Sequence, residues 1–161
     1  MPLLPVLQIC PGNPAPPTAI LRTPAREVTD FPASLHALAA DLLETLRHHG
    51  AAGIAAPQAG IPLRIAVVEP EAGRPLVLVN PRITEEAGPV SEGPEACLSL
   101  PGIRCVVRRP GALGVAYQDP AGVRHVLEAQ GLLSRIIAHE VDHLEGVLCT
   151  DRAIRMMAGE P

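Results

Sequence analysis

Residues 132–144 read Leu-Leu-Ser-Arg-Ile-Ile-Ala-His-Glu-Val-Asp-His-Leu, an apolar run followed by two histidines four residues apart. This pattern predicts a helix that ends at Gly146. On such a helix His139 and His143 project from one face, where both imidazoles can bind a single metal ion. The carboxylate of Glu140 then leans toward a metal-bound water. The combination indicates metal-assisted hydrolysis.

The rest of the chain alternates apolar runs with turn residues. Leucines at helical spacing predict a helix from Thr29 to His49, with Asp30 or Ser34 capping its start. A loop of small residues at 50–60 lets backbone approach another surface closely. Strands are predicted at Arg64–Val68, Leu76–Val79, within 82–90, and at Ile103–Val107, Gly114–Tyr117 and His125–Ala129.

Short turns, rather than crossover helices, join the predicted strands. Asn80-Pro81 is expected to end one strand, residues 91–95 to form an acidic loop, and residues 119–122 to form a turn. The order helix, strands, helix favours an α+β fold, with mostly antiparallel sheets packed around the C-terminal metal-binding helix. A length of 161 residues fits one ordinary domain, so we expect a single catalytic domain over residues 1–161.

Composition and charge argue against several classes of partner. Phe31 and Tyr117 are the whole aromatic set, which is too few for stacking platforms that bind nucleic acid. A net charge of -4 without a dense arginine run disfavours nucleic acid and anionic lipid. No apolar run approaches the length of a membrane span. The proline-rich start lacks the charged segment and the apolar segment of a signal peptide. We therefore expect a cytoplasmic protein without a membrane segment.

Two histidines alone also occur on solvated helix faces, so a third ligand is needed. Catalytic zinc-type sites use three protein ligands and leave one position open. Cys97 is the strongest candidate, because it lies in the acidic, turn-bounded stretch Glu-Ala-Cys-Leu-Ser-Leu-Pro-Gly at 95–102. Its alternative is a buried structural cysteine. The rivals Cys10, Cys105 and Cys149 lack such a setting, although Cys149 lies close to His143 in sequence.

Three motifs in this order resemble the peptide deformylases: residues 53–58 (Gly-Ile-Ala-Ala-Pro-Gln), residues 95–102, and residues 139–146. The match spans nearly the whole chain. The resemblance implies that Cys97, His139 and His143 hold the metal, with a water at the fourth position. It also implies an activity, the removal of the N-formyl group from the N-terminal methionine of newly synthesised polypeptides.

The resemblance also assigns the residues that act on the substrate. Glu140 would take a proton from the water and pass it to the departing amine. The side-chain amide of Gln58 and the backbone N–H of Leu98 would stabilise the negative charge that gathers on the formyl oxygen. Glu95 is a candidate for orienting a ligand histidine.

Peptide binding is predicted less directly. In similar enzymes the backbone at Gly53 pairs with the extended peptide as an added strand. Ile54, Leu133 and Ile137 are candidates for the methionine pocket, with the hydrophobic core as their alternative. Arg104 resembles a basic residue that lines the groove of the family.

The family also implies a cofactor and partners. Ferrous iron is the metal expected in the cell, whereas zinc, nickel or cobalt ions can occupy the same ligands in preparations. The partners are formylated nascent peptides, with a transient ribosome association. Alanines stand where the family usually has Gly, Gly and Gln, at Ala51, Ala96 and Ala138.

Two other functions compete with an active deformylase. The first is a metal-binding paralogue with weak, altered or no turnover, which the alanines at positions 51, 96 and 138 favour. A metallopeptidase that cuts internal bonds would need a further His or Glu ligand after Leu144, where few acidic residues remain.

Overall fold

The computed structural model describes residues 2–9 and 17–157, so Cys10 lies outside the described residues. Its helices are α1 (Pro17–Leu21), α2 (Ala33–His48) and α3 (Gly131–Leu144), with 3-10 turns η1 (Ala56–Ala59) and η2 (Cys149–Asp151). Its strands are β1 (Gly53–Ala55), β2 (Ile65–Val68), β3 (Leu76–Ala87), β4 (Ser91–Ala96), β5 (Arg104–Arg109), β6 (Ala112–Gln118), β7 (Arg124–Gln130) and β8 (Ala153–Met156). Within these ranges, no helix has the length and apolar content needed to cross a membrane.

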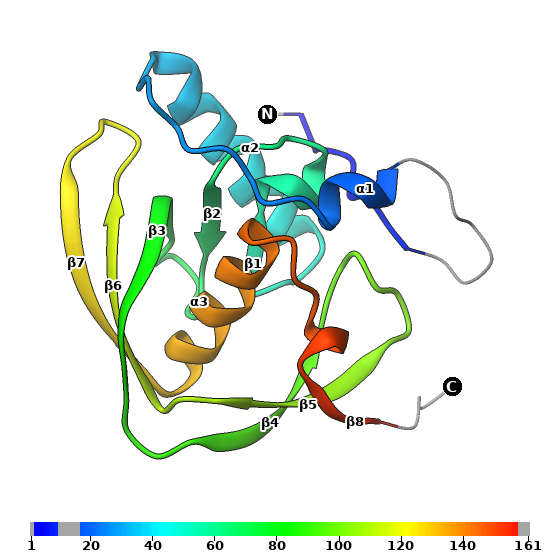
Figure 1. Cartoon of the computed structure of the whole chain (residues 1–161). Helices are drawn as coiled ribbons and strands as arrows, with labels where there is room; N and C mark the ends of the chain where they lie inside the picture. The colour runs from blue at the N-terminus through cyan, green and yellow to red at the C-terminus, as the bar shows by residue number, and fades with distance from the viewer. Residues whose placement is uncertain (1, 10–16, 158–161) are drawn as a thin grey trace.

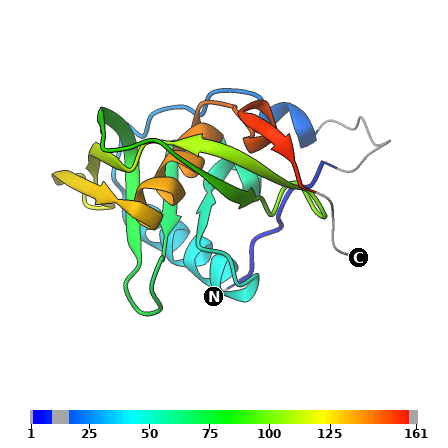
Figure 2. The same ribbon diagram turned by 90° about the horizontal axis from the view of Figure 1, so that it is seen from below.

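The strands form two antiparallel sheets. One has the order β1-β2-β3-β6-β7 and the other has the order β4-β5-β8. Helix α3 lies between the two sheets (Figure 1), and the view from below shows the same arrangement (Figure 2). The predicted α+β fold with a C-terminal helix against antiparallel sheets is confirmed.

The two long helices cover opposite faces of the first sheet. Side chains alternate between faces along a strand. In β2, Ile65 and Val67 belong to the core under α2, whereas Val68 belongs to the core under α3. This double burial explains why β2 is apolar throughout. It also fixes α3 against the sheet, with its polar side free to face β4 and β5.

Helix α2 begins later than predicted. Its first residue is Ala33 and not Thr29, because Pro32 is the N-cap and has an extended backbone with φ -72° and ψ 163°. A proline disfavours helical angles at the residue before it, which keeps Phe31 out of the helix. No side chain caps this helix, so the predicted capping by Asp30 or Ser34 is wrong.

Strand β3 continues through the pair predicted to end it. Asn80 has φ 50°, and the pairing of β3 with β6 shifts between Val79 and Arg82. The missing N–H of Pro81 falls in this irregularity, where no ladder hydrogen bond is required. The Asn80 side chain accepts from the Val28 N–H and donates to the Val28 carbonyl, each at 2.8 Å. The bulge therefore joins two predicted strands into one bent strand.

Residues 91–95, predicted as an acidic loop, belong to strand β4, which ends at Ala96. Their Ser, Glu, Gly and Pro composition is poor for a strand. The pairing with β5 stabilises it, with Ser91 opposite Arg109 and Ala96 opposite Arg104. The predicted loop at 50–60 likewise contains β1 and η1, and α1 and β8 were not predicted. Strands β1, β4 and β8 form through pairing with neighbouring strands rather than from a local sequence pattern.

Candidate metal centre

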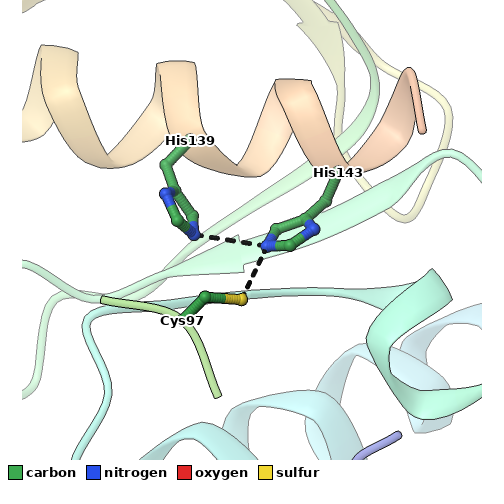
Figure 3. A group of neighbouring side chains, drawn as sticks. All are labelled: Cys97, His139 and His143. Atoms are coloured by element: carbon green, nitrogen blue, oxygen red, sulfur yellow. Dashed lines mark hydrogen bonds between the residues drawn. The ribbon is translucent and has the colours of Figure 1, made fainter. Parts of the chain in front are cut away.

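The three predicted ligands meet between helix α3 and the end of strand β4. The Sγ of Cys97 lies 3.1 Å from Nε2 of His143, and the two Nε2 atoms of His143 and His139 lie 3.2 Å apart. All three ligand atoms lie within 4.8 Å of one another. Figure 3 shows both imidazoles hanging from one side of the helix toward the thiol. One thiolate and two imidazoles are a donor set suited to a first-row transition metal.

His139 is oriented by a carboxylate. Its Nδ1 lies 2.9 Å from Oε2 of Glu95, so Nδ1–H donates there and Nε2 is the ring atom that a metal would bind in place of a proton. Burial alone would raise the pKa of Glu95, but hydrogen bonds from His139 and Arg109 lower that pKa to about 2. Glu95 is therefore an anion at neutral pH and holds the ring in the tautomer that a metal requires.

The cluster favours one positive charge. Burial and the neighbouring charge on His139 lower the pKa of His143 to about 3. Burial opposes charge on His139 as well, but hydrogen bonds with Cys97 and Glu95 raise its pKa to about 10. At neutral pH the cluster therefore keeps one proton, on His139, and does not take up a second proton on His143. A divalent cation bound by the same atoms would supply positive charge in place of the proton, so these residues fit a metal.

Glu140 lies beside the ligands without being one of them. It is 3% exposed, and its Oε2 has no hydrogen-bond partner among the described residues. Burial raises the pKa of Glu140 to about 7, although the charge on His139 acts in the opposite direction. An unpaired buried carboxylate costs free energy. Its pKa near neutrality suits a group that accepts and returns a proton.

The Gln58 side chain is held so that its NH₂ group faces the ligands. Its Oε1 accepts the N–H of Ala55 at 2.9 Å, which fixes the amide orientation. Its Nε2 then lies 3.4 Å from Sγ of Cys97 and 3.4 Å from Oγ of Ser99. The turn η1, with Pro57 at its start, provides this geometry. The amide therefore offers donors next to the metal ligands.

A cavity of about 650 Å³ opens onto these groups. Several predicted residues line it, namely Gly53, Gln58, Cys97, Leu98, Arg104, His139 and Glu140. Gly53 fits tightly, because a Cβ at this position would lie 2.8 Å from Cδ of Glu140. The structure therefore brings the three sequence motifs to one concave site.

The apolar candidates for the methionine pocket lie elsewhere. Ile54 is fully buried under α2, since its neighbour Gly53 faces the cavity and side chains alternate on β1. Ile137 is also fully buried in the core between α3 and the sheet, and Leu133 packs against the same core.

Leu132 and Ile136 are the apolar residues of α3 that line the cavity instead. Their spacing to His139 and Glu140 follows the helical repeat, which places all four on one face and could have identified them.

The rivals Cys105 and Cys149 pack in one apolar cluster with Cys97, Val107 and Leu148. Cys105 and Cys149 are 0% and 2% exposed. Burial raises the pKa of the Cys149 thiol, which disfavours the thiolate that binds metal. Neither cysteine belongs to the ligand group formed by the described residues.

The three unusual alanines are accommodated. Among the described residues, Asn80 is the one non-glycine with positive φ, so Ala51 and Ala96 do not occupy a glycine-only conformation. Both line the cavity. Ala138 is 4% exposed and packs in the core between α3 and the sheet. An apolar side chain suits that position.

This chain is similar in sequence and in fold to known proteins. The model of the polypeptide deformylase family matches residues 13–158. A peptide deformylase from Dictyoglomus thermophilum is 42% identical over 135 residues, covering 84% of this chain and 87% of that protein. A Synechococcus elongatus peptide deformylase in complex with actinonin has a TM-score of 0.87 and 37% identity, covering 96% of this chain and 81% of that chain.

An Acinetobacter baumannii peptide deformylase with Met-Ala-Ser bound has a TM-score of 0.84 and 33% identity, covering 93% of this chain and 98% of that one. The family match and the close relative extend across the fold and over all three motifs. The chain therefore belongs to the polypeptide deformylase family of metal-dependent hydrolases.

Proposed function

We propose that this chain removes the formyl group from the N-terminal methionine of newly synthesised polypeptides and releases formate. One observation carries the proposal: Cys97 and His139 of a Cys-His-His ligand set line one cavity together with an unpaired carboxylate and an oriented amide. Hydrolysis of an amide needs an activated water, a proton carrier and donors for the oxyanion. The cavity contains residues for each of these tasks.

Cys97, His139 and His143 are the proposed metal ligands, and ferrous iron is the proposed metal in the cell. Zinc, nickel or cobalt ions suit the same ligands in preparations. When bound, the ion would lower the pKa of a coordinated water toward neutrality and polarise the formyl oxygen. The metal content of anaerobically purified protein, measured by elemental analysis, tests this assignment.

Glu140 is the proposed proton carrier. Its carboxylate lines the cavity and occupies the space that the absent side chain of Gly53 leaves free. With a pKa of about 7, the group can accept the proton of the attacking water and later protonate the departing amine. This transfer makes the peptide amine a better leaving group without an additional acid.

Gln58 and Leu98 are the proposed donors to the oxyanion. The Gln58 NH₂ group already points toward Cys97, and Leu98 is the next residue after that ligand. As the formyl carbon becomes tetrahedral, its oxygen gains negative charge between these two groups. Preorganised donors of this kind contribute about 3 kcal/mol each to stabilising the transition state.

The peptide is proposed to lie along the cavity with its backbone paired to β1 at Gly53. The three residues of β1 pair with β2 along one edge, while Gly53 lines the cavity. Leu132 and Ile136 offer an apolar wall for the methionine side chain. Arg104, exposed at the cavity, is placed to contact the downstream peptide. Ile54 contributes to peptide binding only as a residue of β1, because its side chain lies in the core.

We place the reaction in the cytoplasm, with formylated nascent chains as partners and a transient ribosome association. Formylated chains are produced on ribosomes, so the substrate itself supports this location. We also propose that residues 1–161 act as a single catalytic domain. Co-sedimentation of the protein with translating ribosomes, compared with idle ribosomes, tests the association.

The decisive assay uses anaerobically prepared, iron-loaded protein and formyl-Met-Ala-Ser. We expect formate release from the unmodified protein and a loss of about 10²- to 10⁴-fold in Glu140→Ala, with metal still bound. Stoichiometric metal without formate release from the unmodified protein would overturn the proposal and favour a metal-binding paralogue. Equal rates from both proteins would remove Glu140 from its role.

A further inference from the structure

Arg135 is a nearly buried arginine that lines the cavity but has no part in the proposed chemistry. It lies on α3 one turn before His139, and its side chain is 14% exposed. Its Nη1 donates to the carbonyl of Val107 at 3.0 Å and to Oε1 of Glu95 at 3.1 Å. Its Nη2 donates to the carbonyl of Ser91 at 3.0 Å. One guanidinium therefore joins α3 to both β4 and β5.

Strand β4 is shaped to receive this side chain. Ser91, Gly93 and Glu95 share one face of the strand, because side chains alternate. Arg135 contacts all three, with the Gly93 carbonyl 3.4 Å from Nη1. A Cβ at Gly93 would lie 2.8 Å from Cζ of Arg135, which is closer than carbon atoms pack. Glycine at this position therefore leaves space for the guanidinium.

The same carboxylate serves Arg135 and a metal ligand. Oε1 of Glu95 accepts from Arg135, and Oε2 accepts from Nδ1 of His139 at 2.9 Å. Arg109 also donates to both oxygens, at 2.9 Å and 3.0 Å. Arg109 extends from β5, whereas Arg135 extends from the helix that carries His139. Arg135 thus links the orienting carboxylate to the ligand helix and to the strand that leads into Cys97.

We propose that Arg135 is a positioning residue that sets the separation between α3 and β4. This separation decides whether Cys97, which follows β4, converges with the two histidines of α3. It also sets the width of the cavity between Leu132 and Ile136 on α3 and the wall formed by β4. The effect on metal binding stands on geometry alone, whereas the effect on peptide binding rests on the proposed function.

The experiment measures metal affinity and peptide kinetics in four variants. Arg135→Met removes every donor, and Arg135→Lys keeps the charge with a single donor group. Gly93→Ala keeps Arg135 but displaces its guanidinium. The matched control is Arg108→Met, since Arg108 pairs with exposed Glu92 on the surface, with side chains 63% and 47% exposed.

Cobalt affinity is measured by competition with a chelator, and KM and kcat are measured with formyl-Met-Ala-Ser at saturating metal. We expect cobalt affinity to fall about 10- to 100-fold in Arg135→Met and Gly93→Ala, with partial recovery in Arg135→Lys. KM should rise more than kcat falls, because Glu140 and Gln58 remain in place. Arg108→Met should match the unmodified protein.

Unchanged cobalt affinity and KM in Arg135→Met and Gly93→Ala would overturn the proposal. A lower melting temperature alone, with both quantities unchanged, would overturn it too, because it would show a structural role only. If Arg135→Met does not fold, Gly93→Ala and Arg135→Lys decide the question. The cobalt measurement needs no substrate. An absence of deformylase activity would therefore count against the proposed function, and the cobalt affinities would still decide the positioning role.

Discussion

At the scale of single residues, Gly53 shows how the site depends on a missing side chain. A Cβ there would lie 2.8 Å from Cδ of Glu140, so Gly53→Ala must displace the carboxylate. We expect formate release to fall by at least about 10-fold, because misplacing a catalytic group is costly, while metal content stays unchanged. Gly114→Ala, on β6 near Thr84, is the control and should affect stability only. Full activity in Gly53→Ala would contradict the assigned position of Glu140.

Gln58 is expected to act in the transition state rather than in peptide binding. Its amide faces Cys97 through the hydrogen bond that Ala55 donates to its oxygen. Gln58→Leu keeps the approximate volume but removes the donors. We expect kcat to fall about 10²- to 10³-fold with KM nearly unchanged, as for other oxyanion donors. Steady-state kinetics at saturating metal measure both constants. A rise in KM with unchanged kcat would instead assign Gln58 to peptide binding.

The residues with distinctive chemistry could be predicted from their types and motifs, whereas residue type alone does not identify the apolar residues of the cavity. Cys97 and His143 have few alternative roles in their motifs, and the structure brings them together. Leucine and isoleucine occur on every buried face, so residue type alone does not separate Leu132 and Ile136 from Leu133 and Ile137, and only the helical spacing to His139 and Glu140 does. The sequence does not single out Arg135 as a site residue, because an arginine within an apolar helical stretch is expected to be exposed.

At the scale of elements, α3 could be predicted because its whole pattern is local. Strand β4 could not be predicted, because its stability comes from pairing with β5. The continuity of β3 was also missed, since the irregularity after Val79 depends on hydrogen bonds between Asn80 and distant Val28. Secondary structure that is specified by partners far along the chain leaves little trace in short windows.

The β6–β7 hairpin offers an element whose stability should depend on pH. Asp119 accepts the N–H groups of Ala121 and Val123 at 2.9 Å and 3.0 Å, and its Oδ2 lies 2.9 Å from Nε2 of His125. The hydrogen bond with His125, more than those from the backbone, lowers the pKa of Asp119. A lowered folded-state pKa stabilises the fold above the ordinary aspartate pKa and loses that effect as pH falls through the folded value.

Asp119→Asn should therefore melt at a lower temperature than the unmodified protein at pH 7. The difference should shrink as the pH falls below the ordinary aspartate pKa of about 3.9. Thermal melts across pH 2.5–7, an assay range chosen around that value of about 3.9, measure the effect. A difference that stays constant across this range would show that the carboxylate charge does not contribute. Asp30→Asn is a suitable control, because Asp30 is an exposed aspartate outside the hydrogen bonds of Asp119.

At the scale of the whole molecule, the proposed metal would connect the two sheets, which otherwise meet through few elements. His139 and His143 belong to the helix that packs on the five-stranded sheet, whereas Cys97 follows β4 of the three-stranded sheet. A metal bound by all three would therefore stabilise the packing of one sheet against the other. A ligand present at about 100 times its dissociation constant adds about 2.7 kcal/mol to the free energy of unfolding.

Chelation should accordingly lower the melting temperature by several degrees, and added metal should restore it. A domain of about 150 residues shifts by about 2–4 °C for each kcal/mol. Cys97→Ser should melt near the chelated protein and respond little to chelator, because one link between the sheets is already weakened. Arg108→Met should respond like the unmodified protein, since Arg108 lies on the surface of β5. If chelator removes the metal without shifting the melting temperature, the ion does not contribute to joining the two sheets, and that role falls to contacts such as those of Arg135 with Glu95 and of Arg109 with Asp142.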